Sequence, residues 1–389
     1  MTKKLLVLSL VLIMAFLAGC GGQSQPAPSK SSEAAKEPIK IGVQGPISGQ
    51  WALEGQGFVK AVTLLADQIN SSGGLLGRKI EIIQGDDKGD PKEAALVAQK
   101  MVTSKVVAVI GAYNSGATEP ASGIYNEAGI LHITPSSTAT VLTTKGYKRF
   151  FRTCFLDDRQ GLFAADFIIN TLGKKNIAII HDNTTYAKGL AEWTKKYAEE
   201  KGGKVVFFDA ITPGEKDFNP ILTKMKAAKP EALYFTGYFS EGGLLVRQAK
   251  QQKIDIAYVA GNANNNPDFV KNAGLDAAKG VFITTEPVPS DLPYPEAKKF
   301  IEDYKAKYKE DPPSIWSVSA ADAFRVIVEA IKQTQSTDPG KLAEYLHTQM
   351  KDFPGITGPI TFDEKGDRKG TIHKAYVIDD KGNFVPYKK

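Results

Sequence analysis

Polar residues gather in the loops that follow short apolar segments of this sequence. The loops of the first half contain Trp51, Asn114, Ser115, Ser136, Ser137 and Thr138, and those of the second half contain Tyr186, Tyr238 and Asn262. Hydroxyl groups and free backbone amides at helix starts can bind a carboxylate or another anion. A single Ser or Thr at such a position is more often only a helix cap. The placement of so many on successive loops favours a common ligand site.

Motifs of nucleophilic, metal and phosphate chemistry are missing from the sequence. It contains no GxxxxGK[ST], HExxH, CxxC or GxSxG pattern. Four histidines lie far apart, and their spacing indicates neither a metal site nor a catalytic triad. His181, beside Asp182, is the one candidate base. We therefore expect no enzymatic activity, no metal ion and no cofactor.

Strands and helices alternate through most of the chain. Apolar segments predict strands at 39–45, 79–84, 106–110, 130–133, 176–180, 205–208, 232–235, 257–260 and 281–284, and helices at 52–70, 91–103, 186–201 and 240–252. Asp90 and Pro91 form a typical helix start. This alternation predicts an α/β protein with parallel sheets covered by helices on both faces. Ligands of such sheets bind beyond the carboxyl ends of the strands, where the polar loops lie.

The first residues predict export from the cytoplasm. Lys3 and Lys4 precede an apolar run at 5–18, and Cys20 follows Leu-Ala-Gly. The run is too short for a membrane-spanning helix of about 20 residues, so residues 1–19 are predicted to be a cleaved lipoprotein signal peptide. Lipidated Cys20 would then anchor the protein to the membrane through a flexible linker, residues 20–38. The alternative is a plain secretory signal with a chance cysteine.

Charge, cysteine content and length limit the possible binding partners, disulfide bonds and domain number. The formal net charge is +6, and the basic residues are scattered without interleaved aromatics, so we expect no nucleic-acid partner. Cys154 is the only cysteine besides Cys20, which leaves no intramolecular disulfide and predicts a small buried residue. The roughly 350 residues after the linker predict two domains.

Ordered motifs along the chain point to a known family. They include Ile41-Gly42-Val43, Gly85-Asp86-Asp87, Ser115-Gly116-Ala117, Thr134-Pro135-Ser136, Phe151-Arg152-Thr153, Gly237-Tyr238 and Gly358-Pro359-Ile360-Thr361-Phe362. With these motifs the chain from Ile39 onward resembles the branched-chain amino-acid (Leu/Ile/Val) binding proteins of ABC importers, which have the type I periplasmic binding fold.

The resemblance implies two doubly wound parallel-sheet lobes joined by a three-segment hinge. The N-terminal lobe would comprise 39–156 plus 286–365, and the C-terminal lobe 157–285 plus 366–389. A small-molecule ligand would lie between them, and the closed protein, a monomer, would deliver it to the membrane subunits of an ABC permease.

The resemblance also assigns roles in the site. Ser115 and Thr138 would hold the ligand carboxylate, the carbonyl of Ser136 would accept from the ligand ammonium, and Asn114 and Ser137 lie in the same loops. Tyr186 and Tyr238 would be the aromatics of the second lobe. Trp51 would be an aromatic lid and Trp316 a wall of the side-chain pocket.

One residue departs from the family pattern. Where the family usually has an Asp or Glu for the ligand ammonium, this chain has Asn262. Loss of a charge-assisted bond typically costs roughly 1.5–3 kcal/mol. Three ligand classes thus stay open: an amino acid, an aromatic or other organic acid, and an amide. A sensory receptor of the same fold is a further alternative.

Overall fold

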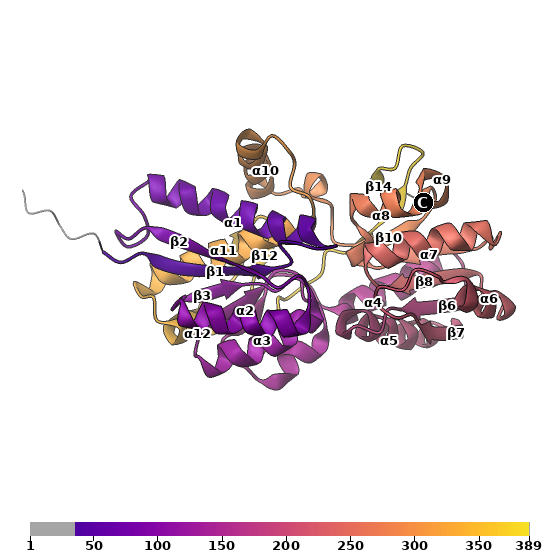
Figure 1. Ribbon diagram of the computed structural model, residues 1–389, viewed down its shortest axis with the longest axis horizontal. Helices are drawn as coiled ribbons and strands as arrows, with labels where there is room; N and C mark the ends of the chain where they lie inside the picture. The colour runs from indigo at the N-terminus through magenta and orange to yellow at the C-terminus, as the bar shows by residue number, and fades with distance from the viewer. Residues whose placement is uncertain (1–35, 389) are drawn as a thin grey trace, which may run out of the picture. The chain divides into compact units, whose positions relative to one another are not determined.

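The computed structural model describes residues 36–388, and Glu37–Lys389 form one compact unit. This unit contains two separate sheets, each covered by helices on both faces (Figure 1). The predicted α/β class with two lobes is therefore confirmed. The predicted signal peptide (1–19) and the predicted lipidation site Cys20 lie outside the described residues.

The first lobe is built on a sheet of five parallel strands in the order β2-β1-β3-β4-β5. The strands are β1 (Ile39–Gly45), β2 (Ile80–Asp86), β3 (Ala108–Ile110), β4 (Leu131–Thr134) and β5 (Phe150–Arg152). One face is covered by α1 (Ala52–Ser71), α10 (Pro295–Tyr308), α11 (Ile315–Thr334) and α12 (Pro339–Thr348), and the other by α2 (Pro91–Thr103) and α3 (Ser115–Glu127). A 3₁₀ helix, η1 (Thr140–Lys145), and a hairpin of β11 (Phe353–Gly355) and β12 (Gly358–Ile360) complete the lobe.

The second lobe contains a seven-stranded sheet in the order β14-β13-β10-β9-β8-β6-β7. Its strands are β6 (Asn176–His181), β7 (Lys204–Ala210), β8 (Ala232–Thr236), β9 (Ala257–Ala260), β10 (Phe282–Thr285), β13 (Lys374–Ile378) and β14 (Phe384–Pro386). The helices are α4 (Asp157–Asp166), α5 (Thr185–Glu200), α6 (Asn219–Ala227), α7 (Phe239–Gln251), α8 (Pro267–Ala273) and α9 (Leu275–Ala278). A π-helix at Phe167–Thr171 and 3₁₀ helices at Asn262–Asn264 and Pro289–Asp291 are also present.

The chain passes between the two sheets three times. It crosses from β5 to α4, from β10 to α10, and from β12 to β13. The last crossing explains a difference from the predicted parallel sheets. Strand β13 enters from the other lobe and pairs antiparallel with β10, and β14 pairs antiparallel with β13. Antiparallel edge strands on a mostly parallel sheet are common in this class.

Local sequence accounts for the positions of the elements. Ile39, Ile41 and Val43 on one face of β1 are fully buried, and Gly42 and Gln44 on the other face are buried too, as expected for a strand covered on both faces. The carboxylate of Asp90 accepts hydrogen bonds from the amides of Lys92 (2.8 Å) and Glu93 (3.0 Å), which confirms the predicted helix start. Most predicted strands and helices agree with the structure to within two residues. No helix of residues 36–388 is both long and apolar enough to cross a membrane.

Candidate functional site

A small cavity lies where loops of the two lobes meet. It has a volume of about 220 Å³. Its lining residues are Tyr113, Ser115, Ser136, Thr138, Tyr186, Tyr238, Asn262, Ala263 and Trp316. Seven of the ten predicted ligand residues therefore surround one cavity. We take it as the candidate ligand site.

A glycine turn positions the first wall. Gly111, at the end of β3, has a φ of +141°, and a Cβ there would lie 2.1 Å from the carbonyl oxygen of Gln44. Only glycine permits this approach without displacing β1. The loop then leads to Ser115, the first residue of α3, whose hydroxyl accepts from the amide of Ala139 (3.3 Å). Ser115 thus brings a hydroxyl to the cavity at the N-terminus of α3, where the first backbone amides have no partner within the helix.

Ser136, Ser137 and Thr138 follow β4 and have different roles. The hydroxyl of Ser136 donates to the carbonyl of Tyr113 (3.0 Å). The hydroxyl of Ser137 lies within hydrogen-bonding distance of Thr118 (2.7 Å) and of the carbonyl of Ala112 (3.2 Å), so its side chain lies inside the lobe and does not line the cavity. The structure thus places the side chain of Ser137 outside the cavity lining, unlike that of the neighbouring Thr138.

A buried arginine holds the backbone around Thr138. The guanidinium of Arg152 donates to the carbonyls of Ser137 (2.9 Å) and Ala139 (3.1 Å), the two neighbours of Thr138. Arg152 is fully buried and forms an ion pair with Asp367, which lies on the third crossing. The loop that presents the Thr138 hydroxyl is thus tied to the hinge.

The second wall carries two tyrosines at helix starts. Thr184 caps α5 by accepting from the amide of Ala187 (3.2 Å), and this places Tyr186 in the first turn. Tyr238 directly precedes α7, and its ring lies 5.4 Å from that of Tyr186. Burial raises the pKa of both hydroxyls above the usual range, so they stay protonated. They are neutral hydrogen-bond donors at neutral pH.

Trp51 and Asn114 lie behind this lining. The ring of Trp51 packs 4.9 Å from the ring of Tyr238, and Tyr113 packs 6.0 Å from the same ring. Asn114 is buried, and neither polar atom of its side chain has a hydrogen-bond partner among residues 36–388. Both residues support the lining rather than form it. Tyr113 was not among the predicted contacts, although it stands in the same loop as Ser115.

Two buried carboxyl groups next to the site were also missed. Asp157, the first residue of α4, is fully buried, and burial raises its pKa to about 7. Its carboxyl lies beside the hydroxyl of Thr138 without reaching good hydrogen-bond geometry. Glu286, directly after β10, accepts a hydrogen bond from the side-chain amide of Asn262 (3.3 Å), and burial raises its pKa to about 7. The rule that found the other site residues, a polar residue after a strand, would have found Glu286.

Comparison with known proteins places this geometry in a family. The model of the periplasmic binding protein family matches residues 38–382. The chain belongs to this periplasmic binding protein family. A leucine-, isoleucine-, valine-, threonine- and alanine-binding protein of Pseudomonas aeruginosa is 39% identical over 343 residues, which are 88% of this chain and 90% of that protein.

A second relative and a solved structure support the same family assignment. A Leu/Ile/Val-binding protein of Escherichia coli is 38% identical over 357 residues, covering 92% of this chain and 94% of that protein. The crystal structure of the branched-chain amino acid transporter substrate-binding protein LivJ of Streptococcus pneumoniae, in complex with isoleucine, has a TM-score of 0.81 and 32% identity, covering 89% of this chain and 97% of that one. The resemblance inferred from sequence motifs is confirmed. These relatives are solute-binding proteins and not enzymes.

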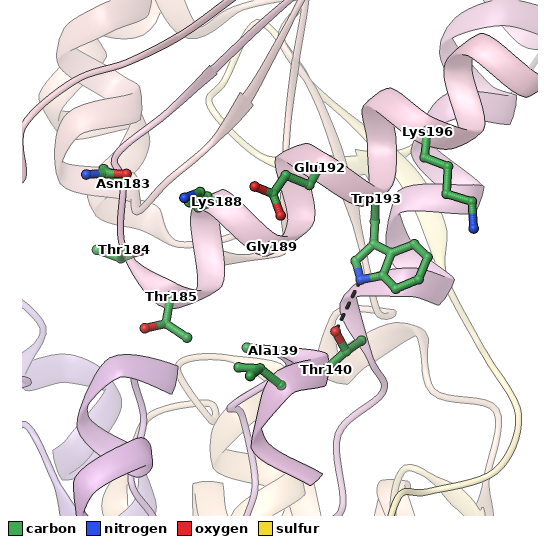
Figure 2. A pocket seen from close by; sticks show the side chains of 11 residues that line it. Ala139, Thr140, Asn183, Thr184, Thr185, Lys188, Gly189, Glu192, Trp193 and Lys196 are labelled. Atoms are coloured by element: carbon green, nitrogen blue, oxygen red, sulfur yellow. Dashed lines mark hydrogen bonds between the residues drawn. The ribbon is translucent and has the colours of Figure 1, made fainter. Parts of the chain in front are cut away.

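This periplasmic binding protein has a larger groove away from the predicted residues. The groove has a volume of about 1130 Å³ and runs between η1 of the first lobe and α5 of the second (Figure 2). Figure 2 shows Lys188, Glu192 and Trp193 projecting from α5, and the indole N–H of Trp193 donating to the hydroxyl of Thr140 (3.2 Å). None of the predicted ligand contacts lines this groove. The smaller cavity is therefore the better ligand site.

Histidine and cysteine residues have structural surroundings. The ring of His181 accepts from the amide of Asn183 (3.0 Å) and packs against Phe208, so the one candidate base stabilises its own loop. The thiol of Cys154 is buried and free, as predicted. Within residues 36–388 no three His, Cys, Asp or Glu side chains are grouped to bind a metal ion.

Proposed function

We propose that this protein is the solute-binding receptor of an ABC importer and that it holds a small amino acid, in particular a branched-chain one, between its lobes. The observation that carries the proposal is the cavity itself. It lies between the two lobes and is lined by seven residues that the sequence analysis predicted as ligand contacts. A ligand there would bridge the lobes and favour their closed arrangement.

The lining of the cavity supports a small ligand with an aliphatic part. Tyr113, Tyr238, Ala263 and Trp316 provide apolar surface, and Ser115 and Thr138 provide hydroxyl donors for a carboxylate. The relatives' names, which include leucine, isoleucine and valine, agree with such a ligand.

The charges around the cavity favour an amino acid over an organic acid without an ammonium group. Asp157 and Glu286 are buried carboxyls beside the lining residues Thr138 and Asn262. Their negative charge would oppose a purely anionic ligand but would attract the ammonium of a zwitterion. An organic acid or an amide remains the alternative ligand.

The setting of the receptor is also part of the proposal. Lobes at 39–156 plus 286–365 and at 157–285 plus 366–389 agree with the three crossings between the sheets. A lipid on Cys20 would anchor a monomer outside the cytoplasm, where its partner would be the membrane subunits of the permease. A sensory receptor of the same fold is the second candidate, and a search for a cognate permease by co-purification separates the two.

Thermal unfolding against a ligand panel tests the proposal. The panel comprises amino acids, branched and aromatic acids that lack the amine, and short amides. A ligand at 1,000 times its Kd should raise the free energy of unfolding by about 4 kcal/mol. We expect the largest shift with leucine, isoleucine or valine. A shift only with acids that lack the amine would replace the amino acid by an organic acid, and the absence of any shift would contradict the role.

A further inference from the structure

The amide of Asn262 is held from two sides. Its Oδ1 accepts a hydrogen bond from the hydroxyl of Tyr186 (2.8 Å), and its Nδ2 donates to Oε2 of Glu286 (3.3 Å). Because a carboxylate can only accept from the NH₂ group, Glu286 fixes which end of the amide faces it. The oxygen of Asn262 is thereby directed toward Tyr186, a residue of the cavity wall.

We infer that Glu286 is a specificity-determining residue, which acts through Asn262 to select ligands that carry an ammonium group. It holds the amide so that its carbonyl oxygen is the acceptor at the cavity, and it places a negative charge directly behind that acceptor. The inference rests on the proposed function. It explains how a chain with a neutral residue at position 262 can still bind an amino acid.

The surroundings of Glu286 leave its charge available to the site. The side chain is 2% exposed, and its second oxygen, Oε1, has no hydrogen-bond partner among residues 36–388. The nearest cationic candidate is Nε2 of His373, 3.7 Å from Oε1, but burial lowers the pKa of His373 to about 3 and keeps it neutral. The side-chain amide of Asn262 therefore donates to Glu286, and the backbone amide of Glu286 and the hydroxyl of Thr285 also favour its ionised form.

Other charged groups act on Glu286 from neighbouring elements. Arg368, on the third crossing, favours the ionised carboxylate, but its guanidinium donates to the hydroxyl of Thr357 and to backbone carbonyls, including those of Thr153 and Gly358. Asp157, the first residue of α4, also lies within the electrostatic reach of Glu286. Burial is the largest effect and raises the pKa of Glu286 to about 7. An ammonium group beside Asn262 would favour the ionised form.

Paired ligands test the inference. L-Leucine and 4-methylpentanoate share a carboxylate and an isobutyl chain and differ only in the ammonium group. We expect Glu286→Gln to weaken leucine binding by about ten- to a hundred-fold, as for loss of a charge-assisted bond. The affinity for 4-methylpentanoate should change less than about twofold. Titration calorimetry with both ligands measures the ratio of their affinities in the unsubstituted protein and in Glu286→Gln, and a change in this ratio supports the inference.

Equal weakening of both ligands would assign Glu286 a structural role and overturn the inference, as would no effect on either. The unsubstituted protein is titrated first, because its failure to bind leucine would contradict the proposed function and the inference together. If the unsubstituted protein binds leucine but Glu286→Gln leaves the ratio of the leucine and 4-methylpentanoate affinities unchanged, only the inference is contradicted. Asp87→Asn is the matched control, since Asp87 is also a buried acid that accepts from a side-chain amide, that of Gln44 (3.1 Å), and it does not line the cavity.

Two further measurements keep the test decisive if Glu286→Gln folds poorly. Asn262→Asp in the Glu286→Gln background moves the acid to the cavity wall and should restore leucine binding, which a purely structural role would not allow. In the unsubstituted protein near pH 6.5, calorimetry in two buffers of different ionisation enthalpy should show more proton release with leucine than with 4-methylpentanoate. Identical proton release for the two ligands would overturn the inference without any substitution.

Discussion

The carboxylate of Glu54, on α1 of the first lobe, accepts a hydrogen bond from the side-chain amide of Asn266, at the start of α8 in the second lobe, at 2.8 Å. The hydroxyl of Ser314 donates to the other oxygen of the same carboxylate. Glu54 is 1% exposed, and burial raises its pKa to about 7. The contact between the lobes therefore contains an acid that titrates near neutrality.

Glu54 makes stability depend on pH. An acid whose pKa is 4.5 in the unfolded chain and about 7 in the native protein binds more protons in the native state between these values. The free energy of unfolding thus falls as the pH rises through this window, by about 3 kcal/mol for this group. Glu54→Gln should remove this part of the slope, so the variant gains stability relative to the unsubstituted protein between pH 5 and pH 8. Urea unfolding at both pH values measures the difference.

The slope that remains in Glu54→Gln should come from other buried acids, because burial also raises the pKa of Asp157 and Glu286 to about 7. Glu310→Gln is the matched control, since Glu310 is an exposed carboxylate paired with Lys60. If both substitutions change the difference in the free energy of unfolding between pH 5 and pH 8 by the same amount, Glu54 has no special role in the pH dependence of stability.

Tyr238 should be essential for binding. Its ring contacts those of Trp51 (4.9 Å), Tyr186 (5.4 Å) and Tyr113 (6.0 Å), so it joins both walls of the cavity. Tyr238→Ala removes this surface and should weaken the best ligand by at least about tenfold, or about 1.4 kcal/mol. Titration calorimetry measures the loss. Tyr258→Ala removes a buried tyrosine of the same lobe that does not line the cavity, and an equal loss of affinity there would attribute the effect to folding.

Arg152 should matter for stability more than any exposed arginine. It is fully buried, pairs with Asp367 and holds the carbonyls on either side of Thr138. Arg152→Ala leaves these acceptors and one carboxylate without their partner, which typically costs about 3–5 kcal/mol. Arg159→Ala, at an exposed pair with Asp158, should cost less than about 0.5 kcal/mol. Chemical unfolding of the two variants measures the contrast, and similar losses would contradict it.

Much of the fold and of the site was predictable because local patterns determine them. Apolar runs such as 39–45 give buried strands. The polar loops after β3 and β4 lie at one edge of the first sheet and those after β6 and β8 at one edge of the second, because parallel strands end at the same edge of their sheet. Ser115, Thr138, Tyr186 and Tyr238 were found in this way, and the structure brings them to one cavity.

The remaining features depend on contacts between distant segments. Ser137 and Thr138 are adjacent and chemically similar, yet only Thr138 lines the cavity, because Thr118 and the carbonyl of Ala112 hold the hydroxyl of Ser137. Glu286 lies 24 positions from Asn262 along the chain, and no local pattern pairs them. The antiparallel strand β13 likewise depends on the third crossing. Such contacts are set by tertiary packing and not by periodicity.

The hydrogen bond between Trp193 and Thr140 should stabilise the closed arrangement of the two lobes (Figure 2). It joins α5 to η1 at 3.2 Å and must break if the lobes separate to release ligand. Trp193→Phe and Thr140→Val each remove the hydrogen bond, so each should weaken ligand binding by about two- to fivefold, mainly through faster dissociation. The double variant should be no weaker than either single one, which gives a coupling energy of about 0.5–1 kcal/mol in a double-mutant cycle. Additive losses, measured by stopped-flow dissociation and calorimetry, would show that the two side chains do not cooperate in holding the lobes together.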